Sequence, residues 1–280
     1  MRRRWPNRGS SGGGFLLDDH PGSYMAFSLR YIASGWVGNN VIQVVRWGDE
    51  AIRDFTASEL NDGTITDWVS DNGNFTPGQS IGRVVTWYDQ TGNGRHMEVA
   101  NVVGSTSHLI VDAGVLTVSK GTVGVKITAR RDIWRVVNSG FNAGDTSMFC
   151  QYEKLDVDRG TFSGSSNATY RVGRYRPGSG ASSAGQTDDR TYVDGVLIGT
   201  NITEGDLDAQ INIGDQHIVS FHKIDASNSS WQTRTGMYGS VNNNLFVCDA
   251  IGKEFIFYNN DQESNDAAIV ADMKTYYPIA

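Results

Sequence analysis

The sequence predicts an all-β fold, a two-sheet antiparallel sandwich, and three observations support this class. Short runs of β-branched and aromatic residues, about a dozen in number, recur between turn signals, as is typical of strands. The chain has 33 glycines and only 5 prolines, a composition that suits many tight turns. Only residues 262–276 show a convincing helical pattern. With 280 residues and no evident repeat, the chain is long enough for one large domain.

Residues 1–14 predict an extended, basic arm rich in glycine. The arm carries four arginines, no acidic residue and no core of its own. Ordering such a segment costs about 1–2 kcal/mol per residue in backbone entropy, so the domain's own acidic surface, a neighbouring copy or a foreign partner must compensate, and we favour a contact with another molecule. In such a contact the arginines would pair with carboxylates and the tryptophan would be an apolar anchor. The arginines are Arg2, Arg3, Arg4 and Arg8, and the tryptophan is Trp5. Residues 15–280 form the predicted sandwich domain.

The first half of this domain combines strands with two short helical segments. Strands are expected at residues 15–17, 24–31, 41–47 and 83–88. Residues 57–60 and 64–69 predict a helical turn and a short helix over one end of the sandwich. After the strand at 83–88, Gly92-Asn93-Gly94 supplies a turn, and the Asp89 side chain is expected to cap it.

The second half predicts short strands separated by turns, followed by the single long helix. The strands are expected at residues 108–111, 115–118, 123–128, 147–152, 190–198, 211–213, 217–222, 235–238, 244–249 and 255–258. The segment 190–198 predicts a hairpin that closes on Asp194-Gly195 as a type I′ turn. Asp261 or Ser264 is available to cap the start of the C-terminal helix.

Residues 87–94, Trp-Tyr-Asp-Gln-Thr-Gly-Asn-Gly, resemble the W-Y-D-Q-S-G-x-G signature of laminin-G-like, concanavalin A-like jelly-roll domains. Residues 26–30 and 41–46 resemble the opening strands of that family, and residues 252–259 resemble its closing strand. The resemblance spans residues 15–280 and is closest to the arabinofuranosidase B catalytic-domain-like modules of phage and marine bacterial proteins. It implies a jelly-roll sandwich whose signature residues are Trp87, Tyr88, Asp89, Gln90, Gly92 and Gly94.

Charge and composition exclude several classes of protein. The net charge of −7 argues against a protein that binds nucleic acid or an anionic membrane. No apolar run approaches the roughly 20 residues of a membrane span. No apolar segment of a signal peptide follows the first arginines, so we expect synthesis in a host cytoplasm without classical export. Cys150 and Cys248 are expected to be buried thiols, although a disulfide between them stays open.

The resemblance raises the question of glycosidase activity. Such enzymes use two carboxyls, about 5–5.5 Å apart in retaining and about 6.5–9.5 Å apart in inverting enzymes. The carboxylates considered are Asp89, Glu98, Glu153, Asp156, Asp158 and Glu254. Asp89 belongs to the fold signature, and Glu254 lies at a position of the closing strand that also indicates a structural role. Because no segment matches the family's nucleophile and acid, we predict no catalytic residue and no enzyme activity.

Glycan binding and calcium binding are the remaining site hypotheses. Exposed aromatic rings stack on sugars while polar groups hold the hydroxyls, and the candidates are Tyr170, Arg174, Tyr175, Arg176 and Trp231. The alternative is that these aromatic residues fill the core. Asp188 and Asp189 are weak candidates for a calcium site, and no other cofactor is expected.

Together these observations lead to the expectation of a non-enzymatic virion structural protein of a tailed phage. It would be a surface jelly-roll module, either a head decoration protein or a tail-fibre adhesin, and an oligomer is one outcome. Its arm would bind other virion proteins or copies of itself, and its outer face would bind host-surface polysaccharide. The alternative is a glycoside hydrolase of arabinofuranosidase type or a soluble carbohydrate-binding lectin.

Overall fold

The computed structural model describes residues 14–71, 80–99, 108–127, 134–156, 160–165, 171–175, 178–181, 190–237, 249–277 and 279. All paired strands named below run antiparallel. The strands are β1 (Ser23–Ser28), β2 (Asn40–Arg46), β3 (Ile52–Thr56), β4 (Gly82–Trp87), β5 (Met97–Val99), β6 (Leu109–Asp112), β7 (Val115–Leu116), β8 (Val118–Ser119), β9 (Thr122–Val123), β10 (Val125–Ile127), β11 (Trp134–Val137), β12 (Thr146–Lys154), β13 (Gly160–Ser165), β14 (Arg171–Tyr175), β15 (Arg190–Val193), β16 (Val196–Thr200), β17 (Gln216–Ile224), β18 (Arg234–Met237) and β19 (Ala250–Tyr258).

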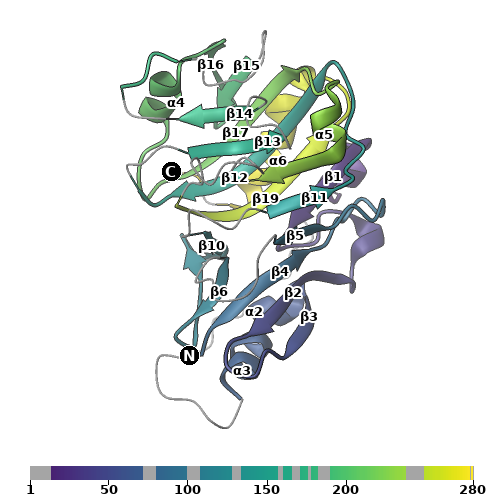
Figure 1. The fold of residues 1–280 in the computed structure, drawn as a ribbon, viewed down its shortest axis with the longest axis vertical. Helices are drawn as coiled ribbons and strands as arrows, with labels where there is room; N and C mark the ends of the chain where they lie inside the picture. Colours follow the sequence, from purple (N-terminus) through teal and green to yellow (C-terminus); the bar gives the residue numbers. More distant parts are fainter. Residues whose placement is uncertain are drawn as a thin grey trace.

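Six short helices accompany the strands. They are α1 (Leu16–Asp19), α2 (Ala57–Asn61), α3 (Thr64–Ser70), α4 (Glu204–Gln210), α5 (Ser229–Thr233) and α6 (Asp266–Tyr276), with 3₁₀ turns at Ser34–Trp36 and Glu263–Asn265. In Figure 1, α2 and α3 lie with β2 and β3 at the lower end of the molecule, while α4, α5 and α6 lie around the upper strands.

The strands form two layers. One layer has the order β16-β15-β17-β12-β19-β1, and the other has the order β14-β13-β18-β11-β5-β4-β2-β3. The short strands β6 and β10 join the layers, because β10 pairs with β19 and β6 pairs with β4. This all-β sandwich confirms the predicted fold class.

The main hydrophobic core lies between the two layers. Tyr152 on β12 contacts Phe162 on β13, with ring centroids 4.5 Å apart, and Phe162 contacts Phe221 on β17 at 5.6 Å. Trp87 and Trp134 fill the other half of the core edge to face at 5.8 Å, and both are fully buried. The contacts of Phe162 with Tyr152 and Phe221 cross from one layer to the other, so these rings help to set the distance between the layers.

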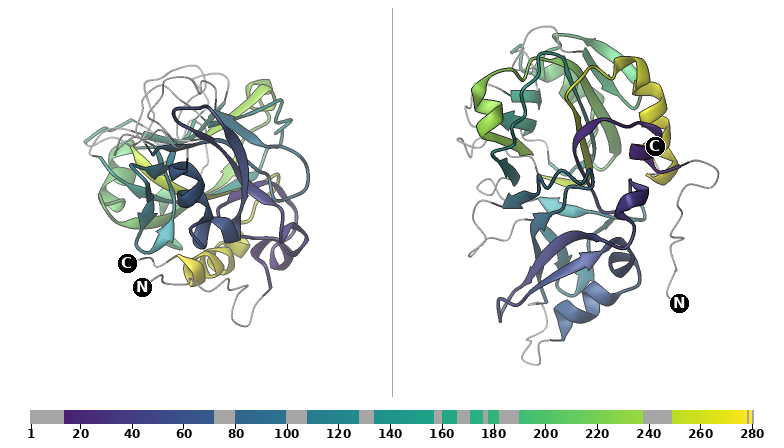
Figure 2. Two further views of the ribbon diagram at one scale, coloured as in Figure 1. Left: turned by 90° about the horizontal axis from the view of Figure 1, so that it is seen from below. Right: turned by 90° about the vertical axis from the view of Figure 1, so that its right-hand side faces the viewer.

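A second, smaller core lies outside the β12–β17–β19 layer, where α6 covers it. Ile269, Val270 and Met273 of α6 pack in one buried cluster with Phe149 and Ile256 of the layer. The right-hand view of Figure 2 shows α6 along the flank of the upper strands. The layer is therefore buried on both faces, which explains why β12, β17 and β19 show almost no exposed residue.

Most of the predicted elements are present, with local corrections. The predicted helical turn and short helix correspond to α2 and α3, and the hairpin turn has positive φ at both Asp194 (55°) and Gly195 (79°), as a type I′ turn requires. The segment predicted as a strand at residues 15–17 is instead the start of α1, and α4 and α5 were missed. The C-terminal helix begins at Asp266, and Asp261 accepts a hydrogen bond from the Glu263 amide in the preceding 3₁₀ turn.

Candidate functional site

The signature segment at the end of β4 is a hub of hydrogen bonds to the backbone. The Asp89 carboxylate accepts bonds from the amides of Ala26 (3.0 Å), Thr91 (3.1 Å) and Arg95 (3.2 Å). It is fully buried, so each of these donors would lack a partner without it. Asp89 thus closes the turn, as its position in the sequence predicted, and it also ties the turn to β1.

Gln90 makes a second connection next to it. Its Oε1 accepts a bond from the Ile32 amide at 3.0 Å, and its Nε2 donates to the carbonyls of Ser28 (2.9 Å) and Arg30 (2.8 Å). The side-chain amide of Gln90 thereby uses both of its N–H donors and one of the two lone pairs of its oxygen. Asp89 and Gln90 are therefore structural residues, and neither is available to a substrate.

Tyr88, in contrast, points away from the core. Its hydroxyl donates to Asp54 Oδ1 at 2.7 Å, and Gln43 Nε2 donates to the same oxygen at 2.9 Å. Partial burial and the neighbouring carboxylate of Asp54 raise the pKa of Tyr88 above its usual value. The His96 ring packs edge-on against Tyr88 at 4.9 Å, and its Nδ1 accepts a bond from the Asp89 amide. Neutral His96 therefore carries its proton on Nε2.

Polar residues continue from Tyr88 and Asp54 across five neighbouring strands, from β3 to β11. The strand register pairs Asp54 with Gln43, Gln43 with Thr86, Thr86 with Glu98, and Glu98 with Arg135. Directly paired residues share one face of a sheet, so these five residues form a single line, which we call the polar row. Neighbouring strands lie about 4.8 Å apart, which makes the row about 19 Å long.

The polar row lies on the face that no other layer of the described strands covers. Its members are partly or fully exposed, whereas their neighbours along each strand, such as Phe55, Trp87, Met97 and Trp134, are completely buried. The alternation of one polar outward residue with one apolar inward residue is the pattern of a sheet with one solvated face. The row is consequently a surface on which an extended polar ligand can lie.

Glu98 and Arg135 give this surface its chemistry. Neither side chain forms an ion pair with any residue in the described ranges, although their positions are directly opposite in the register. The Nε atom of Arg135 is buried and lacks a hydrogen-bond partner among the described residues. A carboxylate and a guanidinium side by side bind hydroxyl groups well, and a carboxyl is also the group that transfers protons in glycoside hydrolysis.

Glu254, another candidate carboxylate, is committed to the fold. It is fully buried and accepts bonds from Arg30 Nε (2.9 Å), Ser28 Oγ (2.7 Å) and the Tyr277 hydroxyl (3.0 Å). Arg30 also binds Asp272 at 3.3 Å, and its pKa is raised because these two carboxylates outweigh its burial. The group anchors the end of α6 to β1 and β19, which confirms the structural role predicted for Glu254.

Glu153 belongs to a polar cluster under the β8–β9 hairpin. It accepts a hydrogen bond from Ser119 Oγ, which in turn accepts one from Gln216 Nε2 at 2.8 Å. Lys253 lies beside it, fully buried, and donates to the Ser119 carbonyl (3.0 Å) and to Thr122 Oγ1 (2.6 Å). Burial lowers the pKa of Lys253 to about 7, although the nearby charge of Glu153 acts in the opposite direction.

A third polar cluster resembles a catalytic triad but is buried from solvent. Ser147 Oγ lies 2.8 Å from His222 Nδ1, and His222 Nε2 lies 2.9 Å from Asp266 Oδ1. Ser147 and His222 are fully buried and Asp266 is 2% exposed, so no substrate can reach the hydroxyl. Ser147 also accepts the Gln262 amide at 2.8 Å. The cluster therefore holds the start of α6 on the sheet.

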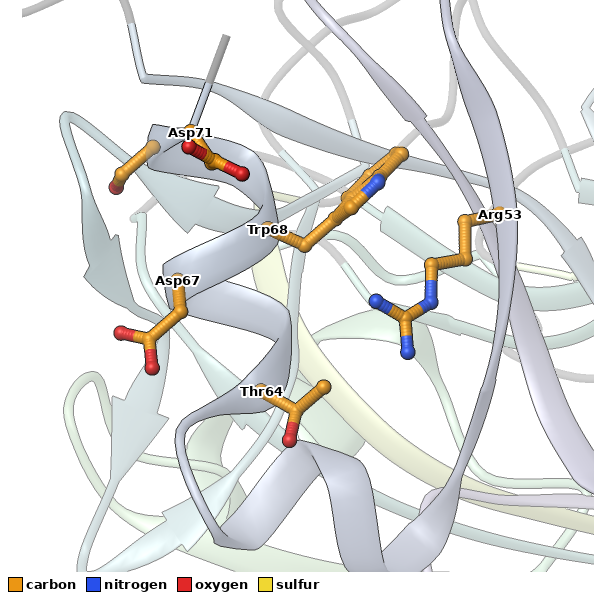
Figure 3. A pocket seen from close by; sticks show the side chains of 6 residues that line it. Arg53, Thr64, Asp67, Trp68 and Asp71 are labelled. Atoms are coloured by element: carbon orange, nitrogen blue, oxygen red, sulfur yellow. The ribbon is translucent and has the colours of Figure 1, made fainter.

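One surface hollow is formed on the α3 side of the small end of the sandwich. It has a volume of about 560 Å³ and is lined by Arg53, Thr64, Asp67, Trp68, Ser70 and Asp71. Figure 3 shows the Arg53 side chain reaching from its strand toward Trp68 and Thr64 on the helix. The volume is within the range of small-molecule sites.

The residues predicted for glycan binding do not assemble as one described site. Trp231 is 1% exposed, since α5 buries it against Phe141, so it fills the core. Arg174 and Tyr175 belong to β14, where only their backbone is described, and Tyr170 and Arg176 lie outside the described residues. The same is true of Asp188, Asp189, Cys248 and the arm residues Arg2, Arg3, Arg4, Trp5 and Arg8; Cys150 is buried.

The described residues contain no group of three or more histidine, cysteine, aspartate or glutamate side chains placed to hold a metal ion. No helix among them has the length and apolar character needed to cross a membrane. The polar row was missed from the sequence because its members come from five different strands and are brought together only by strand pairing. The visible signal was Gln43, a polar residue within an otherwise apolar strand.

Comparison with protein-family models finds no match, and comparison with curated proteins finds none either. Among solved structures, the chain is similar to a mutant GH54 α-L-arabinofuranosidase soaked with 4-nitrophenyl α-L-arabinofuranoside, with a TM-score of 0.53 and 15% identity over 91% of this chain. It is also similar to an arabinofuranosidase complexed with arabinofuranosyl-α-1,2-xylobiose, with a TM-score of 0.51 and 14% identity over the same share. The chain spans 64% of the length of each of these proteins.

These findings correct the expected function. The expectation of a non-enzymatic virion structural protein, without enzyme activity, is contradicted because the matched structures are glycoside hydrolases. The part of the resemblance that concerns the arabinofuranosidase sandwich is confirmed, whereas no finding supports a phage origin. The prediction was wrong because it relied on a local catalytic motif, whereas the two carboxyls of a glycosidase are defined by their separation in space.

Proposed function

We propose that this chain is a glycoside hydrolase of arabinofuranosidase type that binds its glycan along the polar row. The observation that carries the proposal is the similarity of 91% of the chain to two arabinofuranosidase structures, both solved with arabinofuranosyl ligands. The open polar row supports it independently, because it offers hydrogen-bonding groups over about 19 Å of exposed sheet.

In this proposal each part of the polar row has a distinct task. Glu98 is exposed and unpaired among the described residues, so it is our candidate for one of the two carboxyls that glycoside hydrolysis requires. Arg135 is partly exposed and lies directly opposite Glu98 in the register, so its guanidinium is placed to donate hydrogen bonds to hydroxyl groups. Gln43 and Asp54, fixed by Tyr88, are a rigid hydrogen-bonding group at the other end.

Hydrolysis of 4-nitrophenyl α-L-arabinofuranoside tests the proposal directly. We expect release of nitrophenol by the full chain and a loss of about 100-fold or more in kcat for Glu98→Gln, since proton transfer contributes about 10²–10⁴-fold. The matched control is Glu50→Gln, another exposed glutamate, which lies in the turn between β2 and β3 and outside the row. Turnover that survives Glu98→Gln would remove Glu98 from the mechanism. No turnover on any arabinofuranoside, with retained glycan binding, would replace the hydrolase with a lectin.

A further inference from the structure

The surface hollow on the α3 side begins where the polar row ends. The row reaches its last strand, β3, at Asp54, and the hollow is lined by the preceding residue, Arg53. Successive residues of a strand point to opposite faces, so the two side chains lie on either side of β3. Among the described strands β3 pairs only with β2, which makes it the edge of its layer. A chain that follows the row can therefore turn around this edge into the hollow.

Trp68 in the hollow is held as a rigid aromatic surface. The Arg46 guanidinium stacks over its ring at 4.7 Å and donates to its carbonyl at 2.6 Å. Phe55 packs edge-on against the indole at 5.4 Å, and the Arg53 guanidinium lies over Phe55 at 4.8 Å. An aromatic ring fixed in advance loses little entropy when a ligand stacks on it.

Of the two acidic residues of the hollow, Asp67 lies in the first turn of α3, where a negative charge is favourable, whereas Asp71 is placed against the needs of the helix. Asp71 is the C-cap of α3, where a negative charge is unfavourable, and it is four residues from Asp67, which repels it. Neither carboxylate forms an ion pair with a described residue. A residue that violates the charge preference of its helix position without a compensating contact tends to be a functional residue. Figure 3 shows both carboxylates at the surface of the helix.

The charge of the hollow selects the type of ligand. Glu59 already neutralises Arg53 at 2.6 Å, so Asp67 and Asp71 leave the surface net negative. Carboxylates accept hydrogen bonds from vicinal hydroxyls, and an aromatic ring stacks on the apolar face of a sugar. An acidic glycan would be repelled. This combination fits a neutral sugar.

We propose that the hollow around Trp68 is a distal subsite that binds a neutral stretch of a polymeric glycan whose other part lies on the polar row. The inference rests on the proposed function, because it extends the same substrate around the edge of the sheet. It assigns to Trp68 a stacking role and to Asp67 and Asp71 hydrogen bonds to hydroxyls. A small aryl glycoside would not reach this subsite.

The test compares a polymer with a small substrate. We expect Trp68→Ala to raise KM for neutral arabinoxylan about tenfold, equivalent to about 1.4 kcal/mol, and to leave kcat/KM for 4-nitrophenyl α-L-arabinofuranoside unchanged. Because Trp68 also packs on the core, the double variant Asp67→Asn/Asp71→Asn is the second test. It should raise the polymer KM and leave Tm near that of the wild type, because the loss of the Asp67–Asp71 repulsion offsets the loss of the favourable charge in the first turn of α3. Trp36→Ala, a partly buried tryptophan outside the hollow, is the control.

The outcomes separate this inference from the proposed function. If the aryl glycoside is hydrolysed and both variants keep the polymer KM of the wild type, the distal subsite is wrong and the hydrolase stands. An equal rise in KM for both substrates would also refute it, because a distal subsite affects only the polymer. If no substrate is hydrolysed, affinity electrophoresis in arabinoxylan gels still tests the hollow: retardation lost in both variants supports it, and unchanged or absent retardation overturns it. Preference for a uronate-rich polymer would overturn the charge argument.

Discussion

Lys253 offers the sharpest physical test, because its buried amine makes stability depend on pH. The amine is fully buried between Glu153, Ser119, Thr122 and the ring of Tyr277, and burial lowers its pKa from 10.5 to about 7. Between these two pH values the unfolded chain holds a proton that the folded chain has released. The unfolded state therefore binds more protons, and the free energy of unfolding rises with pH.

The magnitude follows from the shift. A difference of 3.5 pKa units corresponds to about 5 kcal/mol over the whole interval, and to about 2 kcal/mol between pH 7 and pH 9. Lys253→Met keeps the length of the side chain and removes the proton site. The difference in unfolding free energy between wild type and variant should therefore change by about 2 kcal/mol in favour of the wild type from pH 7 to pH 9.

Urea denaturation at constant ionic strength measures this difference. All other titrating groups are shared by the two proteins, so their contributions cancel in the comparison. Lys126→Met on the neighbouring β10 is the control, because that lysine is 38% exposed and should show no such trend. Parallel pH profiles for wild type and Lys253→Met would refute the reasoning, since they would mean that the amine keeps its ordinary pKa in the fold.

Three further substitutions test the contacts that hold the site in place. Asp89→Ala leaves several buried amides without an acceptor and should lower the free energy of unfolding by about 3–5 kcal/mol; thermal unfolding that matches the wild type would contradict its role as a hub. Glu254→Ala leaves the mostly buried charge of Arg30 with Asp272 as its remaining carboxylate partner and should cost about 3 kcal/mol in urea denaturation, whereas Glu254→Gln keeps the bond from Ser28 and should cost less. Thr56→Ala removes the capping box of α2 and should cost about 1 kcal/mol; calorimetry showing no change in Tm would contradict that cap.

Several features of the fold were readable from local sequence because the responsible interactions are local. The Asp194-Gly195 turn and the helices α2 and α3 all depend on residues within a few positions of each other. The short helix α1 was mistaken for a strand because Phe15-Leu16-Leu17 has no period long enough to distinguish the two. Trp231 could not be assigned from its polar neighbours, since α5 turns it inward.

By itself, the sequence determined the fold class, the turn chemistry of residues 87–94 and the structural role of Asp89 and Glu254. These follow from periodicity, from residues that favour turns, and from a signature that matches a known sandwich. Only the tertiary structure decided that Asp54, Gln43, Thr86, Glu98 and Arg135 form one row, because register between distant strands is set by packing over the whole layer. The tertiary structure also decided which carboxylates are exposed. Glu254 and Glu98 have the same side chain, but Glu254 is buried and holds the fold together, whereas Glu98 is exposed on the polar row.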